Sequence, residues 1–204
     1  MYSKAKIFNL ALGVLLLQRQ IVNPDTDQSN EAKVLLSHWD TALWSALEDM
    51  DLDSTSTQVD LSLVATDPNG LWVYAYKYPN NCAFFRRLQS SIETDNRSTH
   101  IPKRTGIYEG QKVIFTNQEN AIAEYIPKDL PLNSLSPNAA MTIAAKLAEL
   151  SSSLVTGKGA RELRKDILDK YVLYKARAQA HDQRENFVYG DPVVESEFVE
   201  ARTE

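Results

Sequence analysis

The side chains of this sequence that could carry chemistry are one cysteine and three histidines. Cys82 is the only thiol, so the chain cannot form an intrachain disulfide or a multi-cysteine metal site. His38, His100 and His181 lie in three separate segments. A nucleophilic thiol needs a base that takes its proton, and no histidine follows Cys82 in a recognisable pattern. We therefore expect no catalytic residues, no metal site and no bound cofactor.

Two polar motifs allow weaker chemical interpretations. The segment 156–159, Thr-Gly-Lys-Gly, has the composition of a phosphate loop, but it stands between two expected helices rather than after a strand. We interpret it as a helix C-cap and connector. The acids Glu48, Asp49, Asp51 and Asp53 only loosely follow the spacing of a calcium loop, which also needs a central glycine and a final glutamate. A solvated helix end explains these acids better.

Charge is distributed unevenly along the chain. It has 22 Lys and Arg against 27 Asp and Glu, a net charge of −5 that argues against nucleic-acid binding through bulk charge. The segment from Lys77 to Lys112 nevertheless contains seven cations and only three acids. The segment from Asp182 to the last residue contains seven acids and only two arginines. One chain with a basic segment and an acidic end could associate head to tail with its own copies, and such contacts form a ring if the rotation closes.

The opening segment has features of a secretory signal peptide. Lys4 and Lys6 precede an apolar run at residues 10–17, but no small-x-small cleavage site follows. Apolar residues between Ile7 and Ile21 recur at spacings of three and four, so we expect a buried first helix, with a signal peptide as the alternative. The apolar run is too short to span a membrane, which needs about 20 residues.

Three more amphipathic helices are expected. The first follows the turn at residues 23–25, covers residues 31–49 and has Asp27, Ser29 and Asn30 as candidate N-caps. The others run from Pro137 to about residue 157, with Ser136 as the N-cap, and from Ala160 to about Glu185. Short connections predict that the helices pack as antiparallel pairs.

The middle of the chain, at residues 57–127, is expected to form a compact antiparallel β unit. Residues 55–66 alternate apolar and polar side chains as one strand does, and a turn follows at residues 67–70. Tyr108-Glu109-Gly110-Gln111 is typical of a hairpin turn. The other expected strands cover residues 71–78, 83–88, 106–108, 112–115 and 121–126.

The expected fold class is therefore α+β, with antiparallel helix pairs in a four-helix bundle, an inserted antiparallel β unit and an extended C-terminal arm. The expected divisions are an N-terminal helix pair at 1–52, a β insert at 53–130, a C-terminal helix pair at 131–185 and an acidic arm at 186–204. The arm has no clean period and an acidic composition, yet it carries three aromatic side chains. Aromatics in such a segment indicate that it orders on a partner.

Three segments together carry a resemblance to a known family. The first is the opening helix pair, with Asn9–Gly13 and then Glu31 to Leu43. The second is the aromatic strand Leu-Trp-Val-Tyr-Ala-Tyr-Lys-Tyr-Pro-Asn-Asn-Cys at residues 71–82, and the third is the alanine-rich closing helices at residues 139–182. Over about residues 5 to 185 the chain resembles the tail tubular protein A family, the head-to-tail adaptors of short-tailed bacteriophages. It departs from the family around Trp44, where relatives often start a strand.

The resemblance implies a non-enzymatic protein of the virion tail, assembled in the host cytoplasm. It implies a ring of about twelve copies between the portal protein and the tail nozzle protein. This ring would enclose double-stranded DNA without sequence-specific binding and would have no membrane partner. An acidic balance suits such a channel, because many cations would hold the DNA phosphates.

The resemblance also suggests two sets of contact residues. In the arm, we expect the aromatic residues to contact the portal or a neighbouring subunit; these are Phe187, Tyr189 and Phe198. In the basic segment, we expect three cations to contact the nozzle; these are Arg97, Lys103 and Arg104.

Two functions from other classes stay open. A small soluble thiol enzyme would use Cys82 as its nucleophile and would need a base nearby in the fold. A nucleic-acid-binding regulatory module would act through the basic segment 77–112. Such a module predicts DNA affinity that falls about tenfold or more over a few-fold rise in salt.

Overall fold

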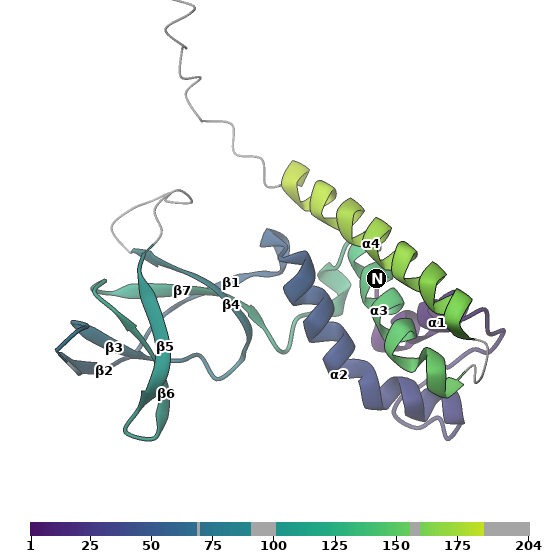
Figure 1. Cartoon of the computed structure of the whole chain (residues 1–204), viewed down its shortest axis with the longest axis horizontal. Coiled ribbons are helices and arrows are strands. Elements are labelled where there is room, and N and C mark those ends of the chain that lie inside the picture. The colour runs from purple at the N-terminus through teal and green to yellow at the C-terminus, as the bar shows by residue number, and fades with distance from the viewer. Residues whose placement is uncertain (69, 91–100, 156–159, 186–204) are drawn as a thin grey trace, which may run out of the picture.

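The structure is a computed structural model that describes residues 1–68, 70–90, 101–155 and 160–185. A helical unit and a β unit lie side by side (Figure 1). The helices are α1 (Lys4–Val14), α2 (Asn30–Met50), α3 (Pro137–Val155) and α4 (Ala160–Glu185), with short 3-10 helices η1 (Asp53–Thr55) and η2 (Leu132–Ser134). The spans predicted for α2 and α4 are confirmed within one residue at each end.

The prediction of a four-helix bundle is wrong. The helices do not form two antiparallel pairs, because α1, α2 and α4 each pack mainly on the central helix α3 (Figure 1). Two features explain this arrangement. The inner positions of α3 are fully buried alanines, including Ala140, Ala144 and Ala148, which let neighbouring helices approach closely. Helix α1 has only 11 residues and cannot run beside α2 along its whole length.

Helix α1 is also shorter than its apolar pattern predicts. It ends at Val14, and Leu16 adopts a positive φ of 60° that takes the chain out of the helix. Ile21 is nevertheless buried, because the side-chain amide of Asn9 forms hydrogen bonds with both the N–H and the carbonyl of Ile21. Asn9 donates to the Ile21 carbonyl at 2.9 Å and accepts from the Ile21 N–H at 2.8 Å. Among the described helices, none is long and apolar enough to cross a membrane.

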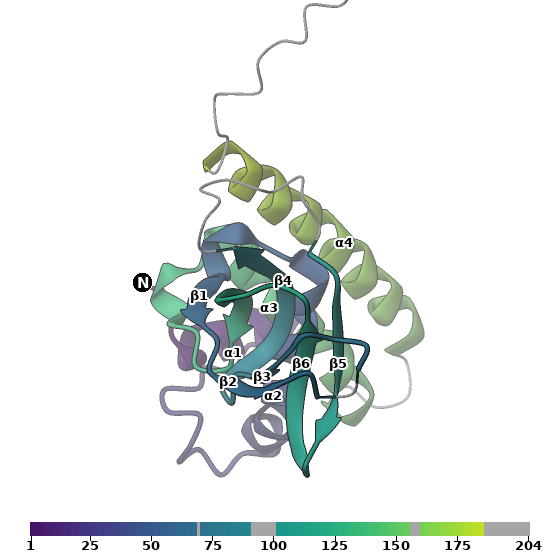
Figure 2. The ribbon, with the colours of Figure 1, turned by 90° about the vertical axis from the view of Figure 1, so that its left-hand side faces the viewer.

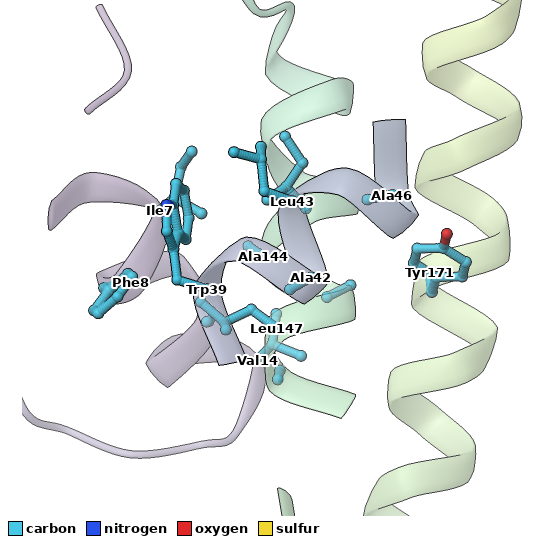
Figure 3. Close-up of a cluster of buried hydrophobic side chains, with 14 of the residues drawn as sticks. Ile7, Phe8, Val14, Trp39, Ala42, Leu43, Ala46, Ala144, Leu147 and Tyr171 are labelled. Atoms are coloured by element: carbon cyan, nitrogen blue, oxygen red, sulfur yellow. The ribbon is translucent and has the colours of Figure 1, made fainter. Parts of the chain in front are cut away.

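The main hydrophobic core lies between the helices (Figure 3). Phe8 of α1 and Trp39 of α2 pack with ring centroids 5.5 Å apart. Leu147 of α3 is fully buried in the same cluster, and α4 contributes Tyr171. Burying a side chain of this size stabilises the fold by about 1.5–3 kcal/mol. The core therefore joins residues from both ends of the chain.

The β unit contains two antiparallel sheets (Figure 2). Sheet A has the order β1-β7-β4, and sheet B has the order β2-β3-β6-β5. The strands are β1 (Thr57–Asp60), β2 (Leu63–Thr66), β3 (Tyr74–Lys77), β4 (Cys82–Ser90), β5 (Lys103–Tyr108), β6 (Gln111–Thr116) and β7 (Ala121–Pro127). The expected hairpin turn is confirmed, since Glu109 and Gly110 have φ values of 48° and 76° and join β5 to β6.

The single strand predicted at residues 55–66 is in fact two strands in different sheets. The N–H of Leu61 donates to Ala121 of sheet A at 3.0 Å. The carbonyl of the next residue, Ser62, accepts from Lys77 of sheet B at 2.9 Å. The chain therefore changes sheet between these two residues, and an alternating pattern carries no information about which neighbour a strand pairs with.

Candidate functional site: an ion-pair joint and a lysine-lined cavity

Glu124 on β7 is a buried carboxylate that is 2% exposed. Three side chains of β4 donate hydrogen bonds to it. Its Oε1 accepts from Arg86 Nη1 at 2.5 Å, and its Oε2 accepts from Arg87 Nε at 2.8 Å and from Gln89 Nε2 at 2.6 Å. Successive side chains of a regular strand point to opposite faces. Here a β-bulge lies between Phe85 and Arg87, and the extra residue lets both arginines reach one carboxylate.

The guanidinium of Arg86 also contacts the end of the helical unit. Its Nε lies 2.6 Å from Asp51 Oδ1, and its Nη2 lies 2.6 Å from Asp53 Oδ1. Asp51 caps α2 in the left-handed conformation, and Asp53 begins η1. Burial disfavours the charged guanidinium, but the hydrogen bond with Asp53 and the charges of Asp51 and Glu124 outweigh it and raise the pKa of Arg86. One side chain therefore binds carboxylates of both units.

Helix α4 closes this arrangement from the other end of the chain. The buried carboxylate of Asp182 accepts the backbone N–H groups of Asp53 at 2.8 Å and Ser54 at 3.0 Å. Gln179 donates to the Met50 carbonyl at 3.0 Å. We call Arg86, Glu124, Asp51, Asp53 and Asp182 the joint, because together they connect sheet A, α2 and α4.

A second feature is a cavity of about 530 Å³ in the β unit. Lys77 at the end of β3, Lys112 in β6 and Lys128 after β7 line it, together with Tyr78 and Cys82. All three lysines are exposed. Among the described residues that line it, none is acidic. We call this feature the lysine cavity.

Cys82 lies in the lysine cavity as a buried thiol, 6% exposed. Its Sγ is 3.3 Å from the Tyr78 hydroxyl. Burial raises the pKa of the Cys82 thiol, although the hydrogen bond with Tyr78 and the charges of Lys112 and Lys128 act in the opposite direction. Burial also raises the pKa of Tyr78, so its hydroxyl stays protonated at neutral pH and does not take the thiol proton. The arrangement therefore favours the unreactive thiol form at neutral pH.

The histidines do not supply a base for the Cys82 thiol among the described residues. His38 lies on α2 and His181 on α4, and neither is among the groups that act on the Cys82 thiol. His100 lies outside the described residues. Within the described ranges, no group of three or more His, Cys, Asp or Glu side chains is placed to hold a metal ion.

The acids near residue 50 are solvated, as expected, at Glu48, Asp49 and Asp51, whereas Asp53 is half-buried. Three of them also have partners far along the chain. Asp51 and Asp53 pair with Arg86. Asp49 accepts from the Tyr171 hydroxyl of α4 at 2.5 Å. Their partners lie in β4 and α4, far along the chain, so the local sequence contained no signal of them.

The proposed nozzle residues have different environments. Lys103 of β5 is half-buried, with its Nζ 3.9 Å from the Phe85 ring centroid and donating to the Arg86 carbonyl at 3.1 Å. Burial lowers the pKa of Lys103. Arg104 is exposed on the same strand. The remaining predicted contact residues lie outside the described residues; these are Arg97, Phe187, Tyr189 and Phe198.

The basic segment 77–112 is therefore not one continuous cationic surface, since Arg86 and Arg87 are held by acids.

The joint itself was not predicted from the sequence. A signal was present, because two arginines interrupt the apolar run at residues 83–88 and Glu124 interrupts the apolar run at residues 121–126. Charged side chains inside strands of this kind need partners when they are buried.

Comparisons with known proteins add no family assignment. No protein-family model matches the chain, and no curated protein sequence matches it significantly. The interpretation of function therefore rests on the sequence segments and on the geometry described here.

Proposed function

We propose that the protein is a structural head-to-tail adaptor of the tail tubular protein A kind. In this role it forms a ring between the portal and the tail nozzle of a short-tailed phage and lines the DNA channel. The observation that carries the proposal is the joint, in which one guanidinium binds acids of the helical unit and of sheet A. An adaptor that transmits position between two rings needs its parts held at a fixed angle.

The energetics of the joint support a rigid connection. The Arg86 side chain is 13% exposed and the Glu124 side chain 2% exposed, so water competes weakly for their pairing. Removing one partner of such a buried pair costs about 3–5 kcal/mol, because the other charge is left uncompensated. Swinging the β unit away from α2 would also separate Arg86 from Asp51 and Asp53. These two side chains are 52% and 33% exposed, so each of these pairs adds only about 0–1 kcal/mol.

Self-association is supported by apolar side chains that the helical unit leaves exposed. On α2 these are Leu36 and Trp44, and on α4 they are Leu168, Val172 and Leu173. The two helices flank α3, so the two sets lie on different faces of the helical unit (Figure 1). Contact between two different faces of neighbouring copies is heterologous, and it generates a ring when the rotation closes.

Two proposed contacts extend the adaptor beyond its own ring. The arm aromatics Phe187, Tyr189 and Phe198 contact the portal or a neighbouring copy, and deletion of residues 186–204 should abolish portal association. The nozzle contact involves the basic residues around β5, of which Arg104 is exposed. Changing Arg97, Lys103 and Arg104 to Glu should block nozzle assembly, and normal assembly of this variant would exclude the contact.

The experiment that tests the proposal is sedimentation of the full chain, alone and with the portal ring of the same phage. Recruitment of many copies onto the portal is the expected result, and a chain that stays monomeric and does not bind the portal contradicts the proposal. The variants Trp44→Glu and Val172→Glu should weaken recruitment. Val22→Glu is the matched control, since Val22 is 88% exposed outside both apolar faces.

A further inference from the structure

We infer that the lysine cavity is a binding site for an acidic peptide, and that its occupant is the segment 186–204 of a second copy of this chain. The inference rests on the proposed ring, because it names the contact that one copy makes with the next. The contact between the lysine cavity and the segment differs from the apolar contacts that we propose between α2 of one copy and α4 of the next. The two contacts can therefore be tested with different variants.

The lysines of the cavity form no ion pair with the part of the chain that the structure describes. Among the ion pairs of the described residues, none includes Lys77, Lys112 or Lys128. Lys112 Nζ instead lies 3.6 Å from the Tyr78 ring centroid, and Lys128 Nζ lies 5.9 Å from the ring centroid of Trp44 on α2. Three positive charges from separate segments thus converge on one cavity without a carboxylate between them.

The nearest acid in sequence, Asp129, is already engaged. It follows Lys128 directly and accepts a hydrogen bond from the Asn81 amide. In contrast, the two half-buried arginines of β4, Arg86 and Arg87, each pair with Glu124. The lysine cavity is therefore a site whose counter-charge must come from outside its own lining.

The volume of the cavity favours a peptide over a small anion. About 530 Å³ falls within the range of roughly 300–1,000 Å³ that is typical of ligand sites, and one phosphate would fill only a small part of it. Lysine is a mobile point charge and suits several carboxylates spread along a chain. The Tyr78 side chain adds an aromatic surface beside the charges.

The segment 186–204 has the complementary composition. It holds five acids against one arginine, and three aromatic side chains stand among them. The same chain therefore supplies both the positive site and an acidic ligand for it.

The segment 186–204 follows α4 and is long enough to reach a neighbouring copy. The end of α4 lies on the opposite side of the molecule from the β5–β6 hairpin, which adjoins the cavity at Gln111 and Lys112 (Figures 1 and 2). A chain of 19 residues spans at most about 65 Å when fully extended. That reach is enough to cross to an adjacent subunit.

The first test is a titration of the full chain with a labelled synthetic peptide of residues 186–204. We expect saturable binding at low salt and a loss of affinity of at least about tenfold in the variant Lys77→Glu, Lys112→Glu and Lys128→Glu. The control variant carries the same charge change on exposed cations elsewhere, Lys33→Glu, Lys165→Glu and Arg177→Glu. Equal loss in both variants, or loss in neither, overturns the inference.

Cys82 gives a local readout of occupancy, because it is the only thiol and it lines the cavity. Saturating peptide should slow alkylation of Cys82 by about tenfold, whereas a peptide with its five acids changed to amides should not. An unchanged rate with the acidic peptide overturns the inference. Stronger protection by a DNA duplex than by the peptide would assign the cavity to nucleic acid instead.

A charge exchange tests the contact between copies. The cavity variant and an arm variant, Glu195→Lys, Glu197→Lys and Glu200→Lys, should each associate weakly alone and regain association when mixed. No regained association overturns the inference. If the cavity variant still assembles on the portal as the unchanged chain does, the inference fails and the adaptor proposal stands.

Discussion

Arg86 of sheet A and Asp53 at the start of η1 form an ion pair of 2.6 Å. The same guanidinium reaches the buried Glu124 at 2.5 Å, and Asp53 is in turn held through its backbone N–H by Asp182 of α4. The connection from the sheet to the last helix thus passes through one arginine and two aspartates. These polar contacts fix the relative position of the two units together with Ile126 of β7 and Phe84 of β4, which pack into the hydrophobic core of the helices.

Replacing Arg86 should destabilise the protein more than replacing an exposed arginine. Arg86→Ala leaves the buried Glu124 with only part of its partners, and we expect a loss of about 3 kcal/mol in the free energy of unfolding. Arg104→Ala is the control and should change stability by less than about 0.5 kcal/mol, because Arg104 is exposed. Urea unfolding measures both, and equal losses would show that the joint carries no special stability.

Gly106 should not tolerate a side chain. A Cβ at this position would lie 2.8 Å from Phe115 Cε2, so Gly106→Ala must displace a ring that packs in the sheet B core. We expect a loss of about 1–3 kcal/mol. At Gly13, a Cβ would meet nothing within 4 Å, and Gly13→Ala should be neutral or stabilising by up to about 1 kcal/mol. Thermal unfolding measures both variants. A loss of stability in Gly13→Ala with none in Gly106→Ala would contradict the packing at Gly106.

Stability should fall at alkaline pH through Tyr171. Burial, together with the hydrogen bond to Asp49 and its charge, raises the pKa of Tyr171 above its ordinary value of 10.0. The folded protein therefore keeps a proton that the unfolded chain releases. This contribution is fully present below about pH 10 and is lost as the pH rises towards the folded-state pKa. Tyr171→Phe should give a flatter fall of unfolding free energy above pH 10, and parallel curves would exclude the effect.

Cys82 should react slowly in the folded protein. Burial raises the pKa of its thiol above 9.0, so alkylation at pH 7.5 should be much slower than in denaturant. The midpoint of the pH–rate profile should lie above that of the unfolded chain. Rapid labelling at neutral pH with a low midpoint would instead revive the thiol enzyme as a functional hypothesis, and Cys82→Ala would then be assayed for lost activity.

Several elements follow from neighbouring residues alone. Helix α2 was predictable because its apolar residues recur at helical spacing and Ser29 caps it by accepting the N–H of Ala32 at 3.2 Å. The turn at Glu109-Gly110 was predictable because Gly110 readily adopts the positive φ that a two-residue hairpin turn needs. In each case the residues that decide the structure are within four positions of one another. Such contacts form largely irrespective of the rest of the chain.

The arrangement of these elements depended on contacts between distant residues. Leu61 and Ser62 pair with different sheets although their sequence reads as one strand, and α3 became the centre of the helices because its alanines permit close approach on several sides.

The candidate site was the part least visible in the sequence. The bulge that brings Arg86 and Arg87 to one carboxylate leaves no periodic signal, and neither does the contact between Asp53 and Asp182, which are 129 positions apart. Periodicity reports which face of an element is buried, because it reflects neighbours three or four residues away. The identity of the partner across a buried ion pair is set only when the whole chain has packed, since desolvation then makes each unpaired charge costly.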